Sequence, residues 1–86
     1  MSAVELLEEA LSVASRLGYR IRSEHLGETR SGACEIGGRK WFFLDLTLNS
    51  VEQLELVLEA LRADAAIQSA TMSKALRKAV SQKQAA

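Results

Sequence analysis

The stretch Ile36-Gly37-Gly38-Arg39-Lys40-Trp41-Phe42-Phe43-Leu44-Asp45-Leu46 decides the fold of this 86-residue chain. Its two consecutive glycines predict a two-residue hairpin, because a type I′ turn needs positive φ at both central positions. The run after the turn is rich in aromatic and aliphatic residues, which predicts a strand over residues 40–48. Residues 33–36 precede the turn, and we expect them to form the short strand that pairs with it.

A two-residue turn also decides which side chains share a face of the hairpin, because cross-strand partners lie on the same face. It pairs Cys34 with Trp41, and Glu35 with Lys40. One face then carries Cys34, Ile36, Trp41, Phe43 and Asp45, while the other carries Ala33, Glu35, Lys40, Phe42, Leu44, Leu46 and Leu48. Both faces are apolar near the hairpin, and we expect the helices to cover the face that holds Phe42, Leu44, Leu46 and Leu48.

Helical periodicity predicts two helices outside the hairpin. Residues 3–17 carry the first apolar stripe, which follows the capping-box spacing of Ser2 and Glu5 and precedes Gly18, a residue suited to ending a helix. Residues 51–63 carry the second stripe.

The second helix has two candidate N-caps, Asn49 and Ser50. Alternating residues over 19–26 predict a first strand. The fold class is therefore α+β, with the order α-β-β-β-α over residues 1–64. We expect a three-stranded antiparallel meander with both helices on one face.

The C-terminal part of the chain differs in charge from the rest. Residues 65–86 contain Lys74, Arg77, Lys78 and Lys83 and no acidic residue, although the whole chain has a formal net charge of zero. Apolar residues recur at helical spacing in this segment. We therefore expect a basic helical tail with a frayed end over residues 82–86.

Composition excludes several classes of protein. The single cysteine, Cys34, rules out an internal disulfide, and with His25 it supplies two of the four ligands that a structural zinc site usually needs. No run approaches the ~18 apolar residues of a membrane span. The acidic N-terminus does not resemble a secretory signal. We expect a cytoplasmic protein with no metal, no cofactor and no enzymatic activity.

Asp45 interrupts the apolar run of the third strand. We expect it to pair with Arg20 or Arg22 of the first strand, or to cap a backbone group. Glu35 is expected to pair with Lys40 across the hairpin.

The most prominent candidate site is the second apolar face of the sheet. Trp and Phe each bury roughly 150–250 Å² when covered, which at ~25 cal/mol per Å² stabilises a protein by several kcal/mol. We therefore expect Cys34, Ile36, Trp41 and Phe43 to be covered by the tail, by a second copy of the chain in a homodimer, or by another protein. On this hypothesis the chain is a protein-interaction or self-association module.

The basic residues support a second hypothesis. Clusters of Lys and Arg bind phosphate groups, so the chain is alternatively a nucleic-acid-binding domain. Its contacts would be Arg20, Arg22, Arg39, Lys40, Lys74, Arg77 and Lys78. A net charge of zero argues against this alternative, because nucleic-acid-binding domains are usually basic.

The run from Gly38 to Leu46, with residues 52–57 after it, resembles short bacterial proteins that have no assigned function. The segment 43–61 is also similar to the core of small zinc metallopeptidases that cleave transcriptional repressors. In those enzymes a helix carries His-Glu-x-x-His, whose histidines bind zinc while the glutamate activates water. Here Glu59 is present and both histidines are absent, so this likeness implies a scaffold without the metal. The element order also resembles the double-stranded-RNA-binding domain.

Overall fold

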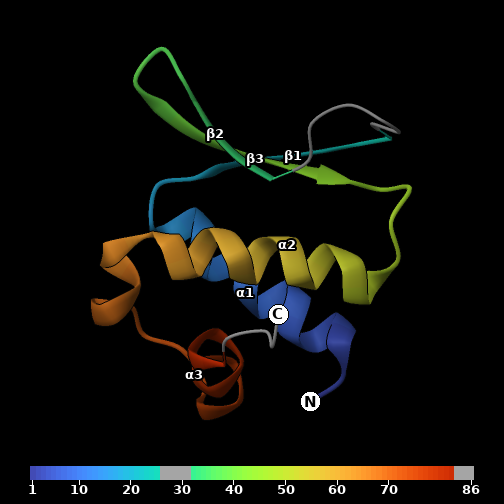
Figure 1. Ribbon diagram of the computed structural model, residues 1–86, viewed down its shortest axis with the longest axis vertical. Coiled ribbons are helices and arrows are strands. Elements are labelled where there is room, and N and C mark those ends of the chain that lie inside the picture. The colour runs from blue at the N-terminus through green and yellow to red at the C-terminus, as the bar shows by residue number, and fades with distance from the viewer. Residues whose placement is uncertain (26–31, 83–86) are drawn as a thin grey trace.

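The computed structural model describes residues 1–25 and 32–82, and it confirms an α+β architecture. The elements follow in the order α1 (Ala3–Arg16), β1 (Arg20–Glu24), β2 (Gly32–Ile36), β3 (Arg39–Asp45), α2 (Ser50–Ala63), the 3₁₀ helix η1 (Ala65–Ser69) and α3 (Lys74–Ser81). Figure 1 shows the sheet, the α1–α2 pair and α3 as successive layers. Leu26, expected in the first strand, and residues 83–86 of the expected frayed end lie outside the described residues.

Both long helices begin with capping boxes, in which side chains satisfy the free N–H groups of the first turn. The Ser2 hydroxyl accepts from the Glu5 backbone N–H at 3.2 Å, and the Glu5 carboxylate accepts from the Ser2 N–H at 3.1 Å. Asn49 and Glu52 make the same exchange at the start of α2, at 2.9 and 3.0 Å. Of the two N-caps that the sequence allows for α2, the structure uses Asn49 rather than Ser50.

The glycine hairpin forms as predicted. Gly37 and Gly38 have φ of +58° and +79°, the left-handed region that a type I′ turn requires. The turn pairs Ile36 with Arg39 and Cys34 with Trp41, so the predicted division of the hairpin into two faces is confirmed.

The predicted antiparallel meander is wrong. The strand order is β1-β3-β2, and β1 runs parallel to β3 while β2 runs antiparallel to it. β3 carries large apolar side chains on both faces and takes the centre, whereas the more polar β1 and β2 take the edges. Residues 25–31 separate β1 from β2. A chain of that length, at roughly 3.3 Å per residue, is long enough to cover the roughly 10 Å across a central strand.

β3 ends earlier than the sequence predicts, at Asp45. The Asp45 carboxylate accepts from the backbone N–H of Thr47 at 2.9 Å and from its hydroxyl at 2.7 Å. This turn confirms that Asp45 caps a backbone group, and it ends the strand. Leu46, which we expected beneath the helices, is instead 42% exposed.

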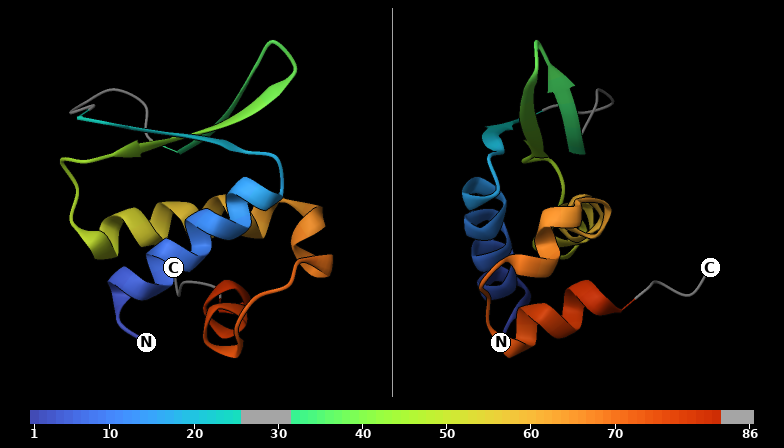
Figure 2. Two further views of the ribbon diagram at one scale, coloured as in Figure 1. Left: turned by 180° about the vertical axis from the view of Figure 1, so that it is seen from behind. Right: turned by 90° about the vertical axis from the view of Figure 1, so that its left-hand side faces the viewer.

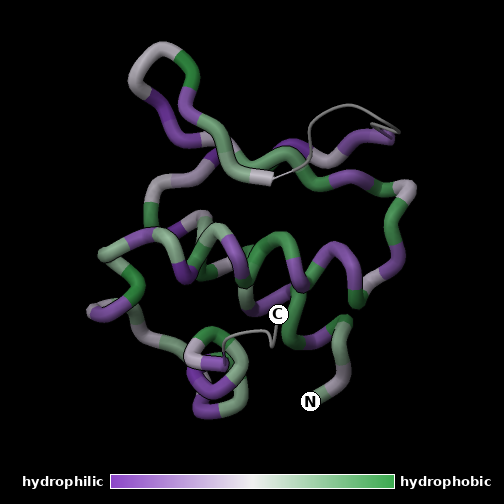
Figure 3. The backbone as a smooth tube through the Cα atoms, viewed as in Figure 1, coloured by the Kyte–Doolittle hydropathy of each residue, from purple (hydrophilic) through white to green (hydrophobic). Residues whose placement is uncertain are grey.

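The hydrophobic core lies between the sheet and the two long helices. Phe42 and Leu44 of β3 are 1% and 4% exposed, and they meet the apolar stripes of α1 and α2. The alternation of hydrophobic and hydrophilic residues along α2 is visible in Figure 3. Within residues 1–25 and 32–82, no helix combines the length and the apolar content that a membrane crossing requires.

α3 packs on the side of the α1–α2 layer that faces away from the sheet (Figure 2). The Arg62 guanidinium of α2 donates to the carbonyls of Val80 at 2.9 Å and Ala79 at 2.8 Å, which satisfies acceptors at the end of α3. At its start, the Ser73 hydroxyl donates to Glu9 of α1 at 2.6 Å. The helical part of the tail therefore does not cover the sheet face that holds Trp41.

Candidate functional site

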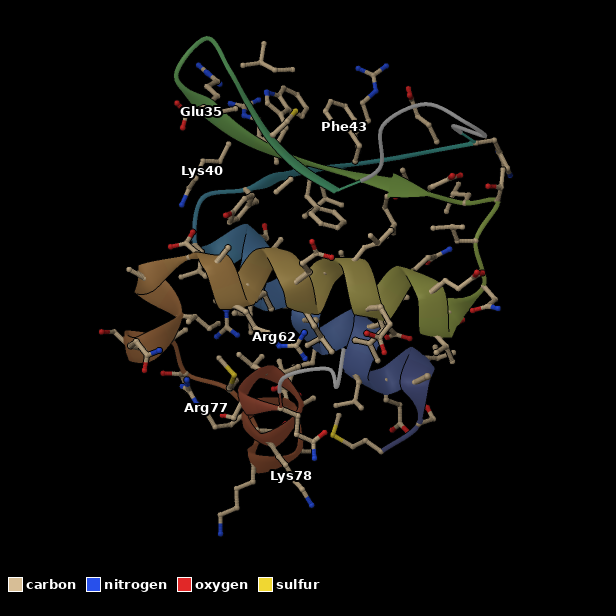
Figure 4. The ribbon with its side chains drawn as sticks, in the orientation of Figure 1. Glu35, Lys40, Phe43, Arg62, Arg77 and Lys78 are labelled. Carbon is tan, nitrogen blue, oxygen red and sulfur yellow. The ribbon has the colours of Figure 1, made fainter. Side chains whose placement is uncertain are left out.

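The sheet face turned away from α1 and α2 is the candidate site, and we call it the outer face. Side chains alternate along each strand, so the register places every second residue on it. Its members are Arg20, Arg22, Glu24, Gly32, Cys34, Ile36, Arg39, Trp41, Phe43 and Asp45. Figure 4 shows Phe43 on this side of the sheet and Lys40 on the side toward the helices.

Two aromatic rings form the centre of the outer face. The centroids of Trp41 and Phe43 lie 5.9 Å apart with their planes at 9°, and both side chains are partly exposed. The Arg20 guanidinium carbon lies 5.9 Å from the Trp41 ring centroid, within the range of a cation–π interaction. Ile36, beside them on β2, is 55% exposed. The structure thus brings together the four residues of the predicted interaction face.

Arginines surround the aromatic centre. Arg20 and Arg22 come from β1, and Arg39 comes from the start of β3. Two acids share this face: Asp45 is buried, and Glu24 forms a 2.7 Å ion pair with Arg22 in which both side chains remain well exposed. Glu35, which interleaves with these residues in the sequence, points to the opposite face. The exposed charged side chains of the outer face are therefore three arginines and one glutamate, an excess of positive charge on a chain that is neutral as a whole.

Lys40, a predicted nucleic-acid contact, lies on the other face. Its ammonium donates to Asp64 at 2.9 Å and lies 4.6 Å from the Tyr19 ring centroid. The hydrogen bond that the Lys40 ammonium donates to Asp64 raises the pKa of Lys40 and lowers the pKa of Asp64. Burial, followed by the hydrogen bond to Asp64, raises the pKa of Tyr19. The register sets Glu35 opposite Lys40 as expected, but the close ion pair of Lys40 is with Asp64.

The three basic residues predicted from the tail are also far from the outer face. Lys74, Arg77 and Lys78 belong to α3, beyond the helix layer (Figure 4). Arg77 donates to the carbonyls of Ile67, at 2.9 Å, and Ala70, so its guanidinium holds the η1–α3 connection. The predicted nucleic-acid residues therefore do not form one surface: three lie on the outer face, Lys40 lies on the helix-facing side of the sheet, and three lie on α3.

The residues with catalytic potential do not converge. Cys34 is a free, partly buried thiol opposite Trp41. His25 is exposed and follows Glu24, whose partner is Asp45. Four register positions separate Trp41 from Asp45, about 13 Å along a strand. In the part of the chain that the structure describes, no three His, Cys, Asp or Glu side chains are grouped to hold a metal ion.

The sequence did not predict two features of the structure. The first is the Tyr19–Lys40–Asp64 cluster, which links residues far apart in the chain and leaves no local pattern. The second is a groove of about 270 Å³ between β2 and α2, lined by Gly32, Ala33, Leu56, Glu59, Ala60 and Ala63. Four of the six lining residues are glycine or alanine, and Ala60 and Ala63 are on the part of α2 that lies next to the edge strand. Glu59, the residue singled out by the metallopeptidase likeness, is exposed at this groove.

No protein-family model matches this chain, and neither a curated protein nor a solved structure matches it significantly.

Proposed function

We propose that this chain is a protein-interaction module whose outer face binds an acidic partner protein. The observation that carries the proposal is the Trp41–Phe43 pair, partly exposed and surrounded by Arg20, Arg22 and Arg39. Tryptophan and arginine are enriched among the residues that dominate binding energy in protein interfaces, which commonly have an apolar centre and a polar rim. A partner with an apolar contact surface and acidic side chains around it is complementary to this arrangement.

The size of the outer face supports a transient interaction. Three strands at about 4.8 Å spacing and about 20 Å length give a footprint of roughly 300 Å². A standard interface buries roughly 800 Å² on each partner, so we expect micromolar binding from this face alone.

Charge favours a different protein over a second copy. Two outer faces brought together place three arginines against three, with Glu24 as the exposed acid on each side. Like charges across an interface cost binding energy, whereas an acidic partner neutralises them. Self-association through this face is the outcome that the sequence also allowed, and sedimentation velocity measures it directly.

Nucleic acid is the alternative ligand of the same surface. Only Arg20, Arg22 and Arg39 of the predicted contacts lie on the outer face, and Arg22 is already paired with Glu24. The logarithm of the binding constant falls with the logarithm of the salt concentration by roughly 0.9 for each phosphate contact. Three contacts therefore give weak binding with a shallow salt dependence. A binding role for protein therefore fits the arrangement better. It also fits better than catalysis, because Cys34 lies on β2 opposite Trp41, whereas His25 follows the far end of β1, whose last residue lies opposite Asp45.

The test compares charge reversals on opposite sides of the molecule. The double variant Arg20→Glu/Arg39→Glu alters the outer face, and Lys74→Glu/Lys78→Glu makes the same charge change on α3. Both variants and the wild-type chain serve as baits in native-host lysate. Each captured protein is then purified and titrated into the three chains, and its binding is followed by Trp41 fluorescence. We expect a partner that binds the wild type and the α3 variant with micromolar affinity and binds the outer-face variant at least tenfold more weakly.

Three results contradict the proposal. One is a reconstituted partner that binds both variants equally. Another is a wild-type dimer that the outer-face variant abolishes, which assigns the face to self-association. The third is binding of a labelled single-stranded oligonucleotide in low salt that depends on Arg20 and Arg39, which assigns it to nucleic acid.

A further inference from the structure

The edge of β2 that faces away from β3, with the groove beside it, forms a second surface, separate from the outer face. Ala33 contributes to the groove from the edge strand, and Leu56, Ala60 and Ala63 contribute from α2. All four side chains are small or apolar and none is fully buried. A groove of about 270 Å³ with such a lining accepts one medium-sized apolar side chain.

The backbone of β2 presents hydrogen-bonding groups along this groove. In a two-residue hairpin the residues flanking the turn, Ile36 and Arg39, form a hydrogen-bonded pair, and such pairs alternate along the ladder. Ile36, Cys34 and Gly32 therefore direct their N–H and C=O groups toward β3. Ala33 and Glu35 direct theirs outward, and no residue in the described ranges hydrogen-bonds to them. This is the row of donors and acceptors that an added strand pairs with.

The charge at the groove is acidic. Glu59 is exposed at its rim, and Glu35 lies two residues beyond Ala33 on the same face of β2. Lys40 lies across from Glu35, and its ammonium is held by Asp64 at 2.9 Å. None of the groove-lining residues is basic.

We propose that an extended peptide segment with a basic residue adds to the edge of β2 and places an apolar side chain in the β2–α2 groove. The backbone of the peptide pairs with Ala33 and Glu35. Residues two apart in a strand face the same side, so the pattern apolar–any–basic sets one side chain in the groove and the next beside Glu59. Pairing of β2 with a second copy of itself is less favourable, because it brings the acidic rims of two molecules together.

The probe is the peptide acetyl-Thr-Val-Thr-Arg-Thr-amide, titrated into the isotope-labelled full chain and followed by amide chemical shifts. We expect saturable shifts centred on the Ala33 and Glu35 amides. Replacing Arg by Glu in the peptide weakens binding, and N-methylation of its backbone on the pairing edge abolishes it. This last control leaves the protein unaltered.

Two protein variants have matched controls. Ala33→Pro removes an outward N–H without touching the β2–β3 ladder, and we expect binding at least roughly tenfold weaker. Ser23→Pro is the control for it on β1. The Glu24 carbonyl accepts from the Leu46 N–H at 2.8 Å, so the backbone groups of Glu24 point toward β3 and those of Ser23 point toward the opposite edge. Glu59→Lys weakens binding roughly fivefold, while Glu8→Lys, an equal charge change on α1, has no effect.

The proposal is overturned if millimolar peptide leaves the Ala33 and Glu35 amides unmoved. It is also overturned if the N-methylated or glutamate-containing peptide binds as well as the first. Concentration-dependent shifts of the same amides in the absence of peptide assign the edge to a second copy instead. None of these results bears on the outer face, whose residues point in another direction.

Discussion

Lys40 at the start of β3 and Asp64 at the end of α2 form a 2.9 Å ion pair that joins the sheet to the helix layer. The Tyr19 hydroxyl donates to the same carboxylate oxygen at 3.0 Å. The other oxygen accepts from the Ala66 N–H at 3.0 Å and so caps η1. One carboxylate therefore connects the entrance of β1, the entrance of β3 and the turn that sends the chain toward α3.

Replacing Asp64 tests this junction. Asp64→Ala removes the ion pair, the tyrosine hydrogen bond and the cap, and we expect a loss of about 2 kcal/mol in the free energy of unfolding. Asp64→Asn keeps an acceptor for the cap and loses about 1 kcal/mol. Urea titration at neutral pH measures both values. Equal losses in the two variants contradict a separate contribution of the cap, and an Asp64→Asn variant as stable as wild type contradicts a contribution of the charge.

The same junction makes folding sensitive to acid. The bond from Lys40 holds the pKa of Asp64 below its usual value. The unfolded state therefore binds a proton more readily, and the stabilisation from Asp64 is complete above about pH 4 and is lost as pH falls through the folded-state pKa. Urea titrations from pH 6 to pH 2 should show the difference in stability between wild type and Asp64→Asn shrinking toward acid. A constant difference over this range contradicts the prediction.

Adjacent phenylalanines should respond differently to truncation. Phe42 is 1% exposed in the core, so Phe42→Ala costs about 3–5 kcal/mol and unfolds much of the protein. Phe43 lies on the outer face, so Phe43→Ala costs about 1 kcal/mol. Thermal unfolding followed by circular dichroism distinguishes them. A comparable loss in both variants is inconsistent with an outer face that is open.

The hairpin turn allows a prediction about backbone alone. A Cβ added at Gly37 meets no atom within 4 Å, so the cost of Gly37→Ala comes only from its φ of +58°. We expect about 1 kcal/mol of destabilisation for alanine and almost none for asparagine, which tolerates the left-handed region. Equilibrium unfolding of the two variants gives the comparison, and asparagine behaving like alanine contradicts it.

Ser73 links α3 to the rest of the molecule. Its hydroxyl caps α3 by accepting from the Leu76 N–H at 3.1 Å, and it also donates to Glu9. Ser73→Ala should destabilise α3 by about 1 kcal/mol, while Ser73→Thr keeps the hydroxyl and the stability. Hydrogen exchange of the Leu76 amide reports on this helix. Exchange that is unchanged in the alanine variant contradicts the role assigned to the cap.

The sequence predicted well where short-range geometry determines the structure. The register of Cys34 with Trp41 followed from the two glycines, and the burial of Phe42 and Leu44 followed from alternation along one strand. The capping box of Ser2 and Glu5 depends on residues three apart. In each case a few neighbouring residues determine the outcome.

The strand order could not be predicted from the sequence. Alternation along β1 indicates which side chains share a face of the sheet, but not which strand β1 pairs with or in which direction. Arg20 and Trp41 occupy adjacent positions in the sheet through a parallel pairing that no local motif marks. The roles of Arg62 and Arg77 were missed for a related reason. Both donate to backbone carbonyls, and an acceptor that every residue carries leaves no sequence signature.

Residue 1 and α3 lie on the opposite side of the molecule from the sheet (Figure 1). An N-terminal biotin or fusion partner is therefore attached behind the helices. A chain immobilised on a sensor chip in this way presents the outer face, with its arginines and tryptophan, to the flowing analyte. Affinity can therefore be measured on such a chip without attaching anything to the sheet.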